Sequence, residues 1–205
     1  MVSDNKKHIL DVYIATIPDE GDITLLSSEE RNREISTVSN EKLRREKYYV
    51  WKLLEYALYR SFGLCAENMN FTKSENGKWF ADECHFSLSH SKRAVAVSVS
   101  CDNNGVDIEC FEKPRFKGFA ERILTERERS DYDNIPLELR DEFLTKKWCA
   151  KESVFKAYGS LMFVPREIET DGVYTQKITL RGGSYILSVA ADNYDNMRII
   201  EVDVV

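Results

Sequence analysis

The sequence predicts an α+β fold built from two similar halves, residues 1–104 and 105–205, which form a pseudo-twofold dimer within one chain. Each half has one long helical pattern, over residues 40–62 and 137–158, followed by strand-like runs typical of an antiparallel sheet. A chain of 205 residues can also bury a substantial hydrophobic core. The two halves share too little identity to establish a repeat, but we expect the functional site in the cleft between them.

The composition excludes several classes of protein. Apolar residues make up 42% and charged residues 31%, as in a globular domain, and no run approaches the length of a membrane span. The first residues lack the apolar core of a signal peptide, so we expect a cytoplasmic protein. The net charge of −6 argues against nucleic-acid binding, although the local clustering of cations leaves room for a pocket that binds a small polyanion.

The five cysteines are odd in number and scattered, with no Cys-x-x-Cys pair. Neither a zinc site nor a disulfide framework is indicated. We expect reduced and mostly buried thiols.

The first half opens with a predicted strand over residues 8–17 and a polar helix over residues 25–35. The long helix that follows should be capped by Asn40 and ended by Gly63. Arg44 lies in its first turns, where a guanidinium could meet a phosphate. A solvated basic face explains Arg44 equally well.

The first half ends in strands. A short strand over residues 69–72 and an Asn76-Gly77 turn precede strands over residues 86–89 and 94–99. Between these strands we expect a serine-rich turn with Ser89 and His90, whose backbone amides and imidazole could hold phosphate oxygens. The alternative is a histidine that is merely exposed.

Residues 105–109, Gly-Val-Asp-Ile-Glu, read as a short strand that carries two acids. Side chains alternate across a strand, so Asp107 and Glu109 should face the same way with Cα atoms roughly 7 Å apart. Both carboxylates could bind one hard cation such as Mg²⁺, provided that a third acid or substrate phosphates complete the shell. The alternative is an edge strand with a polar face.

The second half should contain three helices: one over residues 119–124, one that begins at Thr125, and one over residues 137–158. On the last of these, Lys151 falls within an apolar stripe, which is unusual because burial of an unpaired ammonium is costly. Glu152 and Lys156 lie together on an adjacent face, either as an ordinary ion pair or as a metal-binding carboxylate with a lysine one turn further on. Strands over residues 172–180, 184–191 and 198–205 should complete the half.

Three motifs in this order and spacing resemble the 4′-phosphopantetheinyl transferases of the long, surfactin-synthetase-activating type. They are Phe-Ser-Leu-Ser-His-Ser at residues 86–91, Gly-Val-Asp-Ile-Glu at 105–109 and Trp-Cys-Ala-Lys-Glu-Ser at 148–153, followed by Phe155 and Lys156. The resemblance runs from about Arg44 to the C-terminus. Two positions depart from the family pattern: Ser87 replaces the usual asparagine, and Trp79 replaces the proline that usually follows Lys78.

The resemblance implies the fold and the activity of this family. Such an enzyme transfers the 4′-phosphopantetheine arm of coenzyme A to a serine of an apo acyl or peptidyl carrier protein and releases adenosine 3′,5′-bisphosphate. The ion would be Mg²⁺, with Mn²⁺ as an alternative, and its expected ligands are Asp107, Glu109 and Glu152.

The resemblance also assigns roles around the substrate. Arg44, Ser89 and His90 would hold the 3′-phosphate of coenzyme A, and Lys78 would lie beside the adenine. Lys151 and Lys156 would face the diphosphate. Our candidate base is Glu152, Lys156 would stabilise the departing phosphate, and Glu128 would lie near the water shell of the metal.

A carrier could dock across residues 111–124, where apolar side chains, among them Phe119 and Ile123, alternate with cations. Because both halves of the site lie in one chain, we expect a monomer. Two other functions stay open at this point: a Mg²⁺-dependent phosphohydrolase, which would need the same acids and lysines, and a non-catalytic coenzyme A-binding module.

Overall fold

The computed structural model describes residues 9–75, 77–111, 117–159 and 162–203, and it confirms a mixed α+β architecture. The elements up to residue 100 include one long helix and most of the first sheet. They are β1 (Leu10–Thr16), α1 (Glu29–Ser36), α2 (Glu41–Phe62), a 3-10 turn (Ala66–Asn68), β2 (Thr72–Lys73), β3 (Trp79–Phe80), β4 (His85–Ser91) and β5 (Ala94–Ser100).

The elements that follow contain the second long helix and the second sheet. They are β6 (Asn104–Cys110), α3 (Phe119–Ile123), α4 (Glu126–Asp133), α5 (Arg140–Tyr158), β7 (Tyr174–Leu180), β8 (Gly183–Ala191) and β9 (Met197–Val202), with 3-10 turns at Leu137–Leu139 and Pro165–Glu167. None of the helices in the described ranges is long and apolar enough to cross a membrane.

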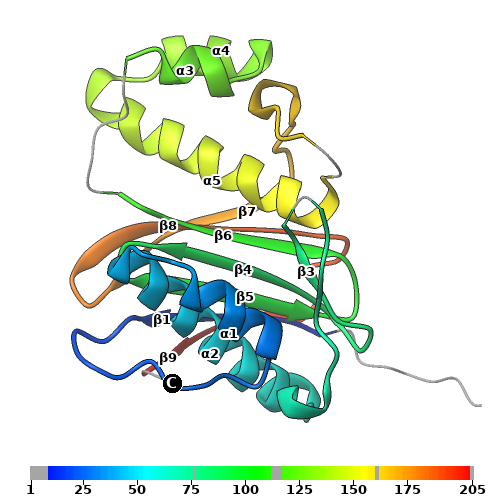
Figure 1. Ribbon diagram of the computed structural model, residues 1–205. Coiled ribbons are helices and arrows are strands. Elements are labelled where there is room, and N and C mark those ends of the chain that lie inside the picture. The colour runs from blue at the N-terminus through cyan, green and yellow to red at the C-terminus, as the bar shows by residue number, and fades with distance from the viewer. Residues whose placement is uncertain (1–8, 76, 112–116, 160–161, 204–205) are drawn as a thin grey trace, which may run out of the picture.

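Two sheets lie between the long helices (Figure 1). The first has the strand order β4-β5-β1-β9, and the second has the order β6-β8-β7. In Figure 1, α1 and α2 cover the first sheet, whereas α5 lies along the second sheet with α3 and α4 outside it. The short β2–β3 hairpin rises beside the C-terminal end of α5.

Helix α2 forms where the sequence predicts it. The Asn40 side chain accepts the amide of Leu43, and Gly63 ends the helix in the left-handed conformation with φ 68°. Its buried face includes Trp51 and Leu54, which pack with Val97 and Val99 of β5. These contacts form the larger core of the molecule and fix the first sheet against α2.

Helix α5 packs very closely on β6 at Gly105. A Cβ atom at this position would lie 2.1 Å from the carbonyl oxygen of Ser153 and 2.5 Å from the amide nitrogen of Ala157. Only a glycine allows such an approach of helix and strand backbones. This contact brings the C-terminal turns of α5 over the acidic strand.

Three alternate serines of β4 connect the two sheets. The hydroxyl oxygens of Ser87, Ser89 and Ser91 accept the backbone amides of Val106, Ile108 and Cys110, respectively, at 3.0–3.2 Å. Successive side chains on one face of a strand are spaced like successive amides on one edge of its neighbour. We call these three residues the serine ladder.

The structure corrects two expectations about the strands. His90 lies within β4, and the turn between β4 and β5 consists of Lys92 and Arg93 instead of a serine-rich segment. Strand β9 joins the first sheet, parallel to β1, and does not extend the second. Its pairing covers the β1 edge, where Leu10, Val12 and Ile14 are buried and pack with Ile199. Strand periodicity alone could not reveal that partner.

Candidate active site

The centre of the site is Asp107 on β6, which is 4% exposed. Its Oδ1 atom accepts hydrogen bonds from the Ser89 hydroxyl at 2.7 Å and from the Lys156 ammonium at 2.6 Å. Its Oδ2 atom is buried and has no hydrogen-bond partner among the described residues. A buried carboxylate oxygen without a partner is costly, which favours a cationic ligand at this position.

Glu152 and Lys156 project from α5 near this carboxylate. Burial raises the pKa of Glu152 to about 7, and the charges of Asp107 and Glu109 act in the same direction while Lys156 opposes them. Burial would lower the pKa of Lys156, but the charges of Asp107 and Glu152 outweigh it and the net shift is upward. The site therefore combines a charged lysine, bonded to Asp107, with the Glu152 carboxylate, which readily takes up a proton near neutral pH.

Glu109 is held in place by α5. Its Oε1 atom accepts the indole N–H of Trp148 at 3.0 Å, and Trp148 in turn packs against Phe119 and Phe163. The strand therefore presents Asp107 and Glu109 toward the same helix, as the alternation predicts.

A pocket of about 240 Å³ adjoins these groups. It lies between the β2–β3 hairpin, β4 and the end of α5, so it opens at the junction of the two sheets. Its lining comprises Gly77, Lys78, Trp79, Phe86, Ser87, Leu88, Glu152, Phe155, Lys156 and Gly159.

Lys78 connects the hairpin to α5. Its ammonium donates to the carbonyl oxygens of Lys156 at 2.6 Å and Ala157 at 3.4 Å, and burial lowers its pKa. A cation at the C-terminus of a helix is favourable because the last carbonyls are otherwise unpaired. Lys78 thus lines the pocket, which is compatible with the predicted position beside the adenine. Its ammonium group, however, contacts the end of α5.

The expected phosphate-binding residues do not form one group in the structure. Ser89 is 5% exposed and its hydroxyl is engaged by Asp107 and Ile108, so it supports the acidic strand instead of facing a ligand. His90 Nδ1 lies 3.1 Å from Glu46 Oε2 on α2. Arg44 lines a different hollow, of about 660 Å³, between α2 and residues 21–25.

Lys151 and Glu128 also occupy a place other than the expected one. Lys151 is fully buried, and its ammonium lies 2.7 Å from Glu128 Oε2 and donates to the carbonyl of Ile168 at 2.6 Å. Glu128 also accepts from Thr170 and contacts Lys147, and it completes a capping box with Thr125 at the start of α4. Among the described contacts, this pair links α4 to α5 and does not touch Asp107. The buried counter-ion Glu128 explains why a lysine can lie within the apolar stripe of α5.

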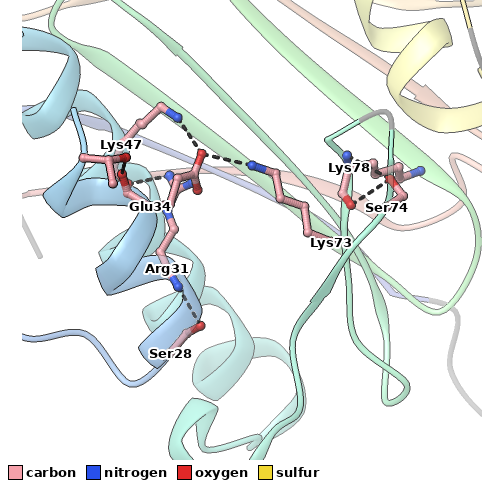
Figure 2. A network of polar contacts seen from close by, with 8 residues as sticks. Ser28, Arg31, Glu34, Lys47, Lys73, Ser74 and Lys78 are labelled. Carbon is pink, nitrogen blue, oxygen red and sulfur yellow. Dashed lines mark hydrogen bonds and ion pairs between the residues drawn. The ribbon is translucent and has the colours of Figure 1, made fainter. Parts of the chain in front are cut away.

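Sequence reasoning missed a second polar cluster, shown in Figure 2. Glu34 of α1 receives three cations: Arg31 and Lys47 at 2.5 Å each and Lys73 at 3.1 Å. These bonds outweigh the opposing effect of burial and lower the pKa of Glu34 to about 2. Helix α1 looked uniformly polar, and only the burial of Arg31 against Trp51 and Trp79 would have revealed the cluster.

The donor set suits a divalent cation, although its ligand geometry is not formed. Within the described ranges no group of three His, Cys, Asp or Glu side chains is arranged to hold a metal ion. The oxygen donors of Asp107, Glu109 and Glu152 nevertheless come from facing elements, and the unpartnered Asp107 Oδ2 fits a hard cation. The predicted ligand set therefore stays a prediction.

The predicted carrier-docking segment is only partly described, because residues 112–116 lie outside the described ranges. Within α3, Phe119 and Ile123 are 6% and 1% exposed and pack with Trp148 and Leu144. These two side chains anchor α3 on α5 and are not free to contact a partner, which corrects that expectation.

Comparisons with known proteins agree with this geometry. A sequence model of the 4′-phosphopantetheinyl transferase superfamily matches residues 104–195, which include the acidic strand and α5. The chain is 32% identical over 114 residues to the 4′-phosphopantetheinyl transferase gsp of Aneurinibacillus migulanus, which covers 55% of this chain and 48% of the relative. It thus matches about half the length of that relative.

Two further relatives differ in length. The 4′-phosphopantetheinyl transferase Sfp of Bacillus subtilis is 27% identical over 154 residues, 68% of each chain. The holo-[acyl-carrier-protein] synthase of Streptococcus pyogenes serotype M12 is 31% identical over 113 residues, which cover 49% of this chain and 95% of the relative. The family model and these relatives show that the chain belongs to the 4′-phosphopantetheinyl transferase superfamily, a group of transferases, and is of the Sfp-like type.

Proposed function

We propose that this protein transfers the 4′-phosphopantetheine arm of coenzyme A to a serine of an apo acyl or peptidyl carrier protein and releases adenosine 3′,5′-bisphosphate. The observation that carries the proposal is the convergence of Asp107, Glu152 and Lys156 beside a pocket at the junction of the sheets. Such a transfer depends on positioning and charge neutralisation more than on covalent chemistry by the protein.

Asp107, Glu109 and Glu152 would hold Mg²⁺, or Mn²⁺ in its place. The bound ion would supply charge neutralisation at the diphosphate of coenzyme A. The Asp107 Oδ2 atom supports this assignment because it is buried without a partner. Ser89 and Trp148 hold Asp107 and Glu109 by hydrogen bonds and thereby limit their side-chain rotation.

Glu152 is suited to act as the base. Its carboxylate lines the pocket together with Lys156 and could accept the proton of the attacking serine hydroxyl, while the pKa of about 7 that burial gives it applies to the protein without the ion. Lys156 keeps its charge and can donate a hydrogen bond to the departing phosphate. The pocket walls formed by Trp79 and Phe155 limit the access of water to the reacting groups.

We further propose that the chain consists of two similar halves that meet near residues 104 and 105, with β9 crossing back to the first sheet. The match of a much shorter relative to about half of this chain supports the division. Both halves of the site would then belong to one molecule, which acts as a monomer in the cytoplasm.

Mass spectrometry tests the transfer directly. An apo carrier protein incubated with coenzyme A, Mg²⁺ and this protein should gain one phosphopantetheine arm on its serine. Release of pantetheine phosphate without a change in carrier mass would indicate hydrolysis and contradict the proposal. A panel of fatty-acid, polyketide and peptide carriers in the same assay would identify the partner class.

Two acids of α5 provide a matched pair of variants. Glu152→Gln should lower turnover by about 10²–10³-fold, because it removes the base and a metal ligand. Glu142→Gln changes an acid that contacts Lys146 and Lys177, and should leave turnover unchanged. Equal activity of the two variants would contradict the role of Glu152.

A further inference from the structure

Two cysteines flank neighbouring strands at one end of the first sheet: Cys84 directly precedes β4, and Cys101 directly follows β5. In the antiparallel pair of β4 and β5, the first residue of β4 faces the last residue of β5, His85 opposite Ser100. One step further along the same register places Cys84 opposite Cys101. Both are free thiols; Cys84 is buried and Cys101 is exposed.

Both side chains also point to the same face of the sheet. Side chains alternate along a strand, so Cys84 shares a face with Phe86, and Cys101 shares one with Val99. Phe86 and Val99 face each other in the register and pack in the core under α2, together with Cys84. The two thiols therefore extend the row of facing side chains by one pair.

The backbone hydrogen bonds decide which kind of pair this is. The amide of Cys101 donates to the carbonyl of Ile9, at the end of β1, over 3.4 Å. Since that amide points toward β1, the position facing β4 is a non-hydrogen-bonded pair. Such pairs have Cα atoms about 4.5 Å apart, within the 4.4–6.8 Å range that disulfides span.

We propose that Cys84 and Cys101 form a reversible disulfide when the protein meets a low-molecular-weight disulfide such as oxidised glutathione. The exposed Cys101 thiolate attacks the oxidant, forms a mixed disulfide and releases one glutathione thiol. The Cys84 thiolate then displaces the second glutathione and closes the protein disulfide. The protein loses two protons and two electrons, and the oxidant is reduced to two thiols.

The environment of the two thiols supports this order of steps. Burial raises the pKa of Cys84 to about 12, and the neighbouring groups Glu83 and Cys101 act in the same direction. Cys84 therefore reacts poorly with a free oxidant. It becomes effective only when an activated sulfur is held directly opposite it.

Peptide mapping after alkylation of the remaining thiols tests the proposal on the full-length protein. Incubation with oxidised glutathione should yield a peptide that joins Cys84 to Cys101, and dithiothreitol should reverse it. The exposed Cys65 is the internal control, and should keep a glutathione adduct. A stable adduct on Cys101 of the unmutated protein, a Cys65–Cys101 link, or no reaction at Cys101 would overturn the proposal.

Two variants separate the steps. Cys84→Ala should leave the adduct on Cys101, and Cys101→Ser should leave Cys84 unmodified. The oxidised protein should also unfold at a temperature several degrees higher than the reduced protein, because the bond closes a loop in the unfolded chain. Cys101→Ser, at an exposed position, should fold and lose this shift, and a shift that persists would contradict the assigned bond. None of these measurements depends on transferase activity.

Discussion

At the scale of single residues, the charges in this protein are arranged around a few buried or half-buried carboxylates. Asp107 and Glu128 each receive a lysine from α5, and Glu34 receives three cations from the first half. The three carboxylates differ in whether one of their oxygen atoms remains without a hydrogen-bond partner. Glu128 and Glu34 are saturated by hydrogen bonds, whereas Asp107 retains a free buried oxygen, and this difference separates structural ion pairs from a site that can take a ligand.

Metal binding should depend on pH through Glu152. Its pKa of about 7 is that of the protein without a metal, and only the deprotonated carboxylate can act as a ligand. The apparent affinity for Mg²⁺ or Mn²⁺ should therefore rise about tenfold per pH unit below 7 and level off above it. Calorimetric titrations between pH 6 and 8 would measure this dependence, and Glu152→Gln should weaken binding and remove the slope. A slope that survives in this variant would show that another group titrates.

Stability should depend on pH through Glu34. Its pKa is lowered from 4.5 to about 2, so its contribution is fully present above pH 4.5 and is lost as the pH falls toward 2. The shift corresponds to about 3 kcal/mol at most, and screening at this half-open cluster reduces it to about 1–2 kcal/mol.

Urea unfolding of Glu34→Gln at pH 7 and pH 3.5 would measure this contribution. The variant should be less stable than the natural protein at pH 7, and the gap should shrink at pH 3.5. Glu29→Gln is the control on the same helix, because its ion pair with Arg33 is exposed and should contribute almost nothing. A gap of the same size at both pH values would contradict the assignment.

At the scale of secondary-structure elements, the site depends on how β4 and α5 are each joined to β6. The serine ladder replaces backbone pairing between β4 and β6 by side-chain hydrogen bonds. Gly105 lets α5 approach the other side of the strand. Asp107 is therefore held between a strand and a helix whose positions are set by small residues.

Removal of the central serine should destabilise the protein more than removal of the outer one. Ser89→Ala leaves Ile108 without its acceptor and removes one of the two donors to Asp107, which should cost about 1–3 kcal/mol of unfolding free energy. Ser91→Ala removes one acceptor at a less buried position and should cost about 1 kcal/mol or less. Denaturant unfolding of both variants would compare them, and equal losses would argue against the double role of Ser89.

A side chain at position 105 should push α5 away from β6. Gly105→Ala places a methyl group against the backbone of α5, which cannot rotate away. We therefore expect the free energy of unfolding to fall by about 1–3 kcal/mol, and turnover to fall as well. Gly183→Ala is the matched control, because its methyl group would meet the side chain of Tyr185, at 2.9–3.3 Å, and no backbone atom among its three nearest neighbours. Unfolding curves and the transfer assay on both variants would show whether the helix contact is the cause.

At the scale of the whole molecule, contacts between distant parts of the chain hold the edge of the first sheet and the hairpin in place. Asp11 of β1, 1% exposed, accepts two hydrogen bonds from Arg198 of β9, at 2.7 and 2.6 Å. Lys78 joins the hairpin to the end of α5. These contacts connect segments that are far apart in the sequence, and the second of them fixes one wall of the pocket against another.

The oligomeric state follows from the same arrangement. Because β4, α5 and the hairpin supply the pocket within one chain, we expect a monomer whose activity per molecule does not change with concentration. Size-exclusion chromatography with light scattering should give the mass of one chain. A stable dimer or trimer with activity that falls on dilution would contradict this expectation.

The sequence by itself determined the features that depend on short-range physics. Asn40 and Gly63 set the ends of α2, Asp107 and Glu109 share a face of β6, and Glu152 and Lys156 share a face of α5 because strand and helix periods are properties of neighbouring residues. The motifs on these elements were sufficient to predict the family.

Only the tertiary structure decided which distant groups meet. It paired Lys151 with Glu128, directed the Ser89 hydroxyl to Asp107, placed β9 beside β1 and set the register of β4 against β5. Each of these contacts is between segments that no local pattern connects. The choice among possible partners is made by the packing of whole sheets and helices, which buries some charges together and leaves Asp107 Oδ2 open.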